Sequence, residues 1–189
     1  MEEEKETKEK KKRKGRRAFL EDFEKQTDGT YKYIGVVWKT EMGQEDFIKR
    51  MKVLLVLGIL CLVIPLAGGF VPAEGLLNTF YVILPYTAVL VAGITILWGQ
   101  ASWYYHGAQL RDYVYEKTVK ALPGRLMAGV ICGSIACLGT TVHIVVQAVV
   151  HRPFGKIIWS VVFLTLMIGY TAICLYMRKK VSEIRYKKA

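Results

Sequence analysis

The residues best suited to chemistry lie in one apolar stretch, CGSIACLGTTVHIVVQ (132–147), and its cysteines come first. The chain has 4 cysteines, Cys61, Cys132, Cys137 and Cys174, and none belongs to a CxxC motif, the spacing that suits thiol–disulfide exchange. Five residues turn a helix by about 140°, so Cys132 and Cys137 point in different directions. A local disulfide would distort the helix. We therefore expect the cysteines to act as small packing residues.

A nucleophilic site would need a cysteine next to a histidine. Cys137 and His143 are separated by about 240° around a helix, so a single helix cannot bring them together. The apolar stretches also contain no Asp or Glu, which are the usual proton carriers inside membranes. The pattern predicts a protein that is not an enzyme and has no cofactor. A membrane-embedded enzyme or metal site is our third hypothesis.

A metal or ligand site is possible at one end of this stretch. His143, Gln147 and His151 are spaced four residues apart, which places them on one face of a helix. Glu74 belongs to the connector expected at the same end of the protein. Two imidazoles and a carboxylate can hold a transition metal, although this spacing is not diagnostic. These four residues are kept as candidate ligands.

The interpretation we favour is that the stretch is a helix-packing seam. Small or polar residues recur at alternating steps of four and three, the spacing of a continuous stripe along a supercoiled helix. Small residues let helix backbones approach closely in membranes, and polar ones can hydrogen-bond between helices. A second apolar stretch has a similar stripe. The predicted seam residues are Gly129, Gly133, Ala136, Thr140, His143 and Gln147 on one helix, and Ala88, Ala92, Thr95, Gly99 and Ser102 on another.

The elements that position these residues are indicated by the distribution of charge. The 189-residue chain is 52% hydrophobic and 23% charged, but four stretches lack Asp, Glu, Lys and Arg altogether. They are residues 53–70, 77–101, 126–150 and 157–177. About 20 apolar residues cross a bilayer as a helix, and a helix satisfies its own backbone hydrogen bonds in lipid. We predict an all-α integral membrane protein, a four-transmembrane-helix bundle.

Basic residues predict how the bundle is oriented, because they gather on the cytoplasmic side. They flank the start of the first span, the connector after the second span and the end of the fourth span. We therefore place both termini in the cytoplasm and the protein in the cell membrane. The basic residues on that side are Lys39, Lys49, Arg50, Lys52, Arg111, Lys117, Lys120, Arg125, Arg178, Lys179, Lys180, Arg185, Lys187 and Lys188.

Outside the spans, residues 1–18 predict a disordered charged tail. Its basic run could bind anionic lipid head groups, whereas nucleic-acid binding is not expected because no folded basic face accompanies it. Residues 19–52 predict a cytoplasmic hairpin, with Asp28-Gly29 as its turn, and a juxtamembrane helix. Residues 178–189 predict a basic tail. The predicted lipid-contact residues are Lys10, Lys11, Lys12, Arg13, Lys14, Arg16 and Arg17.

The connector after the second span predicts a helical extension. Residues 107–122 place apolar side chains on one stripe. Proline is absent between Pro85 and Pro123. We therefore expect the second helix to continue into the cytoplasm as far as residue 122.

The function that best fits these features is that of a non-enzymatic assembly or adaptor subunit of a membrane complex, either a homo-oligomer or a hetero-complex. The alternative is a small permease or channel subunit whose polar seam lines a path. Residue types alone do not decide whether the seam lies within one chain or between chains.

Overall fold

A computed structural model describes residues 23–25, 30–73, 75–150 and 154–188. Within this part of the chain, four helical segments are long and apolar enough to cross a membrane. Three are the single helices α2 (Gln44–Gly69), α3 (Phe80–His106) and α6 (Phe154–Ser182). The other combines α4 (Asp112–Tyr115), the π-helical turn η2 (Glu116–Lys120) and α5 (Leu122–Val149). The protein is therefore mostly helical, as expected for a multi-pass membrane protein.

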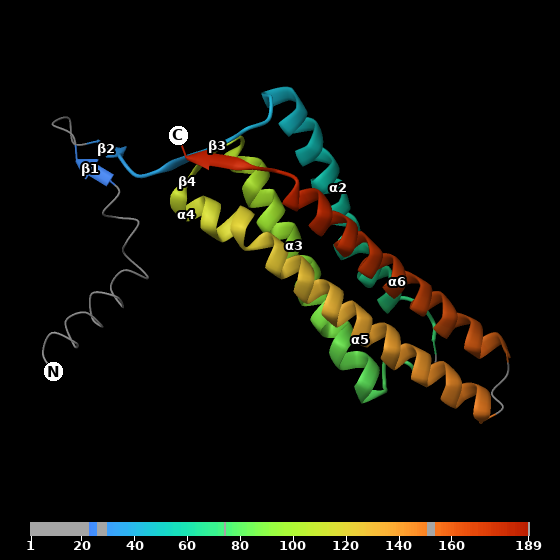
Figure 1. Ribbon diagram of the computed structural model, residues 1–189. Coiled ribbons are helices and arrows are strands. Elements are labelled where there is room, and N and C mark those ends of the chain that lie inside the picture. The colour runs from blue at the N-terminus through green and yellow to red at the C-terminus, as the bar shows by residue number, and fades with distance from the viewer. Residues whose placement is uncertain (1–22, 26–29, 74, 151–153, 189) are drawn as a thin grey trace, which may run out of the picture.

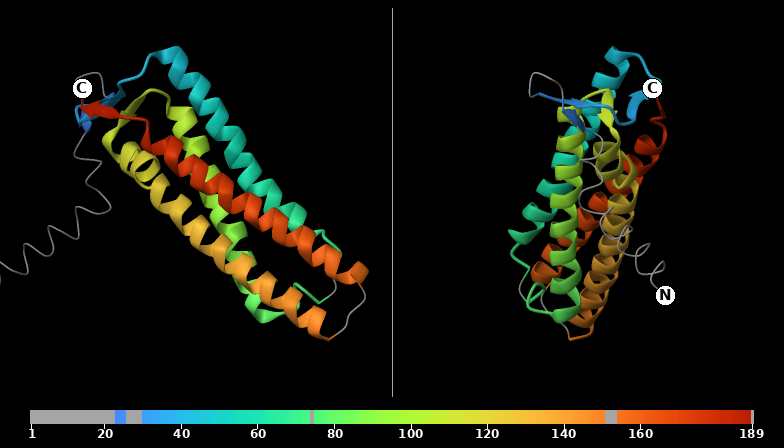
Figure 2. Two further views of the ribbon diagram at one scale, coloured as in Figure 1. Left: turned by 45° about the vertical axis from the view of Figure 1, so that its right-hand side comes forward. Right: turned by 90° about the vertical axis from the view of Figure 1, so that its left-hand side faces the viewer.

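The four helices run side by side along one axis (Figures 1 and 2). Helix α2 packs against α3 and α6, and α5 packs against the same two helices. The bundle is thus a four-sided arrangement in which α2 and α5 lie on opposite corners. The outward-facing sides of the helices carry exposed aliphatic side chains, such as Val63, Ile94 and Leu138, which lipid would solvate.

The core of the bundle follows a seven-residue repeat on all four helices. Buried positions alternate by steps of four and three, the spacing that keeps one face of a helix toward its neighbours in a left-handed supercoil. This geometry is common in membrane bundles. The core positions are Phe47, Met51, Leu54, Gly58, Cys61, Pro65 and Gly68 on α2; Val82, Tyr86, Val89, Gly93, Ile96, Gln100 and Trp103 on α3; Leu122, Leu126, Gly129, Gly133, Ala136, Thr140 and His143 on α5; and Ser160, Phe163, Met167, Tyr170, Cys174, Met177 and Val181 on α6.

Glycine allows two of the helix pairs to approach closely. A Cβ at Gly93 of α3 would lie 2.8 Å from the carbonyl oxygen of Cys61 on α2, and one at Gly139 of α5 would lie 2.5 Å from that of Tyr81 on α3. Both atoms belong to the backbone, so neither can move without moving its helix. These two positions set how near α3 can lie to its neighbours.

A three-stranded antiparallel sheet closes one end of the bundle. Its central strand β3 (Val37–Thr40) pairs with β4 (Gln109–Arg111) on one side and with β5 (Tyr186–Lys188) on the other. The sheet thus joins the segment before α2, the connector after α3 and the segment after α6, as Figure 1 shows. Within residues 178–189, predicted as a basic tail, the chain completes α6 and forms β5.

Two tryptophans attach this sheet to the helices. The Trp38 indole stacks on Tyr115 at 4.3 Å and donates to the Asp112 carboxylate at 2.7 Å. The fully buried Trp103 donates its indole N–H to the Tyr186 hydroxyl at 2.8 Å. Burial raises the pKa of Tyr186 to about 12, so this hydroxyl stays neutral at physiological pH. Each indole nitrogen is satisfied as it is removed from water, which fixes the sheet to α3 and α4.

A separate strand pair lies before the sheet. Strands β1 (Phe23–Lys25) and β2 (Tyr31–Tyr33) are antiparallel, and the predicted turn Asp28-Gly29 lies outside the described residues. The Arg111 guanidinium lies over the rings of Phe23 and Tyr33, at 5.6 and 5.2 Å from their centroids. The Tyr33 hydroxyl also accepts a hydrogen bond from the backbone of Asp112 at 3.2 Å. These contacts hold β1 and β2 against the sheet end of the bundle.

The expectation that the second helix continues to residue 122 is wrong. Helix α3 ends at His106, because Gly107 adopts a φ of +72° that an ordinary helix cannot continue through. The chain then reverses into β4, where Leu110 is fully buried. The apolar stripe after 107 belongs to the third membrane helix, which starts at Asp112. The turn η2 precedes Pro123, and such widened turns accommodate irregular hydrogen bonding within a helix.

The close contact at Gly139 gives a test of this packing. Gly139→Ala should destabilise the protein by about 1–3 kcal/mol, because its methyl group would overlap the Tyr81 carbonyl. The matched control is Gly169→Ala on α6, where a Cβ meets nothing within 4 Å. This control should be neutral or stabilising by up to about 1 kcal/mol, since alanine is the better helix former. Unfolding in mixed detergent–SDS micelles measures both changes, and equal effects would contradict the packing described.

Candidate functional site

The predicted seam on α5 faces the interior of its own chain. Gly129 lies opposite Tyr170 and Cys174 of α6, and Gly133 lies opposite Tyr170 and Thr171. The rest of the seam follows the same face: Ala136, Thr140 and His143 are buried, and Gln147 is half-buried. The structure therefore places the α5 seam on the inner face of its helix, with Gly129 and Gly133 against α6.

The polar side chains of this seam bond along the helix. Thr140 donates to the carbonyl oxygen of Ala136 at 2.8 Å, and the side-chain nitrogens of His143 and Gln147 are 2.8 Å apart. Both contacts join residues four positions apart on α5.

Only some of the predicted seam residues on α3 are buried in the bundle. Ala92 and Gly99 are buried, Ala88 and Ser102 are half-buried, and Thr95 is exposed. The buried stripe of α3 runs one residue further on, through Gly93 and Gln100, and it includes large residues as well as small ones. Gly99 packs beside Leu122 and Arg125 at the start of α5.

Two of the four candidate metal ligands lie outside the residues that the structure describes. Glu74 and His151, the partners proposed for His143 and Gln147 in a metal site, are outside the described residues. Among the residues that are described, no group of three or more His, Cys, Asp and Glu side chains could hold a metal ion. The predicted lipid-contact residues from Lys10 to Arg17 also lie outside the described ranges.

Two cysteines from different helices meet in the core. The Sγ atoms of Cys61 on α2 and Cys174 on α6 are 3.7 Å apart, and the Met177 Sδ lies 3.7 Å from Cys61. The thiols are free. Sequence reasoning missed this pair because it compared cysteines within one helix. The signal was the seven-residue repeat, since both cysteines occupy core positions of their helices.

This contact predicts a specific crosslink. Treating membranes with a permeant thiol oxidant should join Cys61 to Cys174, each thiol losing one hydrogen to the oxidant, because their Sγ atoms need only approach to about 2.05 Å. Mass spectrometry of alkylated digests would detect the α2–α6 linkage. The single variant Cys61→Ser should abolish it and leave Cys132 and Cys137 unpaired. A Cys132–Cys137 linkage in the wild-type chain would contradict the arrangement.

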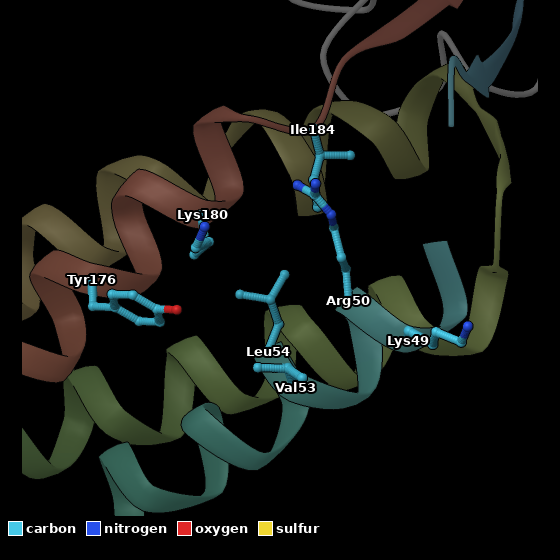
Figure 3. A pocket seen from close by; sticks show the side chains of 7 residues that line it. All are labelled: Lys49, Arg50, Val53, Leu54, Tyr176, Lys180 and Ile184. Carbon is cyan, nitrogen blue, oxygen red and sulfur yellow. The ribbon is translucent and has the colours of Figure 1, made fainter. Parts of the chain in front are cut away.

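A cavity opens on the outer surface between α2 and α6, near the sheet end (Figure 3). The two helices lie farther apart here than at the opposite end of the bundle (Figures 1 and 2). The cavity has a volume of about 280 Å³, close to the lower end of the ~300–1,000 Å³ common for small-molecule sites. We call it the α2–α6 groove. It is lined by Lys49, Arg50, Val53, Leu54, Tyr176, Lys180 and Ile184.

The α2–α6 groove combines a basic rim with an apolar floor. Arg50 and Lys180 both contact the carboxylate of Glu183, at 3.3 and 3.2 Å, and these pairs are part-exposed to solvent. The Lys180 ammonium also lies 5.8 Å from the centre of the Tyr176 ring. Lys49 also lines the groove, and no acidic residue is among its described lining residues. The groove therefore carries excess positive charge.

Sequence reasoning used these basic residues to predict orientation but did not identify them as a site. The signal was available in part, because Arg50–Leu54 and Tyr176–Lys180–Ile184 are spaced by four residues and share helix faces. What the sequence lacked was the separation of α2 from α6, which depends on the sheet at this end.

Comparison of the chain with protein-family models, characterised proteins and solved structures finds no match. Function must therefore be inferred from the geometry of the bundle, the sheet and the groove.

Proposed function

We propose that this chain is a non-enzymatic integral membrane protein, an assembly or adaptor subunit that associates with copies of itself or with other membrane proteins. One observation carries the proposal. The seam that could have joined two chains is occupied by the chain's own helices, since Gly129 and Gly133 pack against α6. The lipid-facing surface and the sheet end are then what the protein can offer to a partner.

The described interior supports this function over transport. The largest fully buried side chains are apolar or aromatic, with Trp103, Tyr170 and Phe163 among them. The buried carboxamide of Gln100 is packed onto Gly58 of α2. A permeation path would require polar groups lining a water-filled channel, whereas these side chains fill the space between the helices.

The sheet end is the surface we assign to partner binding. It brings together three separate parts of the chain and exposes apolar side chains beside them, with Tyr31 67% and Ile34 59% exposed. Basic residues gather at this end, which supports placing it and both termini in the cytoplasm of a cell with the protein in the cell membrane. The basic run between Lys10 and Arg17 would add attraction to anionic lipids.

The test is the composition of the protein purified in a mild detergent. We expect native mass spectrometry to find the chain bound stoichiometrically to a second copy or another membrane protein. The double variant Tyr31→Asp/Ile34→Asp should lose this partner, because two charges would replace exposed apolar contacts. The control Thr30→Asp/Gln109→Asp adds the same charges at exposed polar positions and should retain it.

A lone chain that conducts ions or solutes after reconstitution into liposomes would contradict the adaptor function and favour the permease or channel alternative. Loss of the partner in both double variants would contradict the assigned surface.

A further inference from the structure

The α2–α6 groove has no part in the proposed adaptor function. We propose that it is a binding site for an anionic glycerophospholipid, whose phosphate contacts Arg50 and Lys180 and whose acyl chain follows the apolar floor. The inference rests on the charge, shape and position of the groove and is independent of any protein partner.

Charge is the first argument. In the described part of the chain, the charged residues that line the groove are all cations, and the one carboxylate paired with Arg50 and Lys180 is that of Glu183. The existing ion pairs are 36–45% exposed on their side chains, so water already competes for them and they hold the rim weakly. A phosphate would offer Arg50 a second acceptor of the geometry that guanidinium groups bind best. A zwitterionic lipid would instead bring its ammonium group close to Arg50 and Lys180.

Position is the second argument. Lys49 and Arg50 lie within about one helical turn of Val53, where the charge-free stretch of α2 begins, and Tyr176 is at the end of the charge-free stretch of α6. The rim therefore lies where the hydrocarbon region would give way to head groups. A tyrosine ring at this depth is typical of a membrane interface, with its ring in the apolar region and its hydroxyl toward water. In Figure 3 the Tyr176 ring lies on the α6 side of the groove, across from Leu54 of α2.

Shape is the third argument. The separation of α2 and α6 narrows away from the sheet end (Figures 1 and 2), and the apolar lining of the groove includes Val53 and Leu54 of α2. Val53 is 56% exposed beside the buried Leu54, which gives the groove an apolar edge open to lipid. A volume of about 280 Å³ suits a phosphate with its glycerol better than a whole lipid. The acyl chain would lie along the outside of the bundle. This is the arrangement expected of basic pockets between membrane helices that hold anionic head groups.

The experiment is lipid titration of the full-length protein in detergent, followed by native mass spectrometry. Phosphatidylglycerol and cardiolipin should each bind, and phosphatidylcholine should not. The variant Arg50→Gln/Lys180→Gln should weaken anionic lipid binding by roughly 30-fold, since each cation near an anionic surface contributes about a fivefold effect. The control Lys39→Gln/Lys187→Gln removes the same charge from exposed positions at the same end and should change binding by about twofold or less.

Two further variants test the groove, and the second of them separates a lipid from a free anion. Glu183→Gln removes the competing carboxylate and should tighten lipid binding by about fivefold while leaving both helices intact. Val53→Ser, at an exposed position, should weaken lipid binding without affecting binding of inorganic phosphate, because only the lipid has an acyl chain to place there. Thermal melting of each variant identifies any that fail to fold.

Three results would overturn the proposal. Equal losses in the groove variant and its control would mean non-specific attraction to the basic end. Binding of phosphatidylcholine as tight as that of phosphatidylglycerol would show that the charge of the lipid does not determine binding. Inorganic phosphate that displaces the lipid at similar affinity, with Val53→Ser unchanged, would assign the groove to a free anion. None of these results bears on the partner test at Tyr31 and Ile34, so the two ideas fail separately.

Discussion

Everything in this structure depends on the close approach of helix backbones that must satisfy their own hydrogen bonds. In a bilayer neither water nor the hydrophobic effect holds helices together, so association depends on fit. The seven-residue repeat of core positions supplies that fit over the full length of all four helices. Gly93 and Gly139 bring α3 against the backbone of α2 and α5, where a single methyl group would intervene. The seam, the sulfur pair and the closed interior all depend on this repeat.

The sheet at one end is a second constraint, because it joins three segments that the helices alone would leave separate. Strand β3 fixes the approach to α2, β4 fixes the reversal after α3, and β5 fixes the end of α6. Trp103 links this sheet to the bundle through Tyr186. With its ends fixed in this way, α2 stands apart from α6 near the sheet, and the basic groove occupies the space. The proposed partner surface and the proposed lipid site thus both lie at the end of the bundle that the sheet closes.

How much of this could be predicted depends on the range of the interaction. The four membrane helices were predictable, because a stretch without charge long enough to cross the hydrocarbon core is a local property. The stripe on α5 was visible for the same reason, as alternating small residues between Gly129 and Thr140. The stripe on α3 was placed one residue off, because its core includes Tyr86 and Trp103, which a search for small residues passes over.

The features that sequence reasoning missed are contacts between distant segments. Gly107 was expected within a helix. Its positive φ could not be foreseen, because it depends on the pairing of the strand that follows. Strands of three or four residues have too few side chains to show alternation, so β4 and β5 were not predicted. The approach of Cys61 to Cys174 and the separation of α2 from α6 needed the relative placement of helices that are over 100 positions apart in the chain.

The central claim is that the polar seam lies inside a closed bundle of one chain. Its most direct test is the reactivity of a cysteine at Thr140, a fully buried seam position, in a background whose native cysteines are replaced by serine or alanine. In intact bilayers, Thr140→Cys should resist a charged methanethiosulfonate reagent from either side and react only after denaturation. Rapid modification in the folded protein would place water beside the seam and contradict the account.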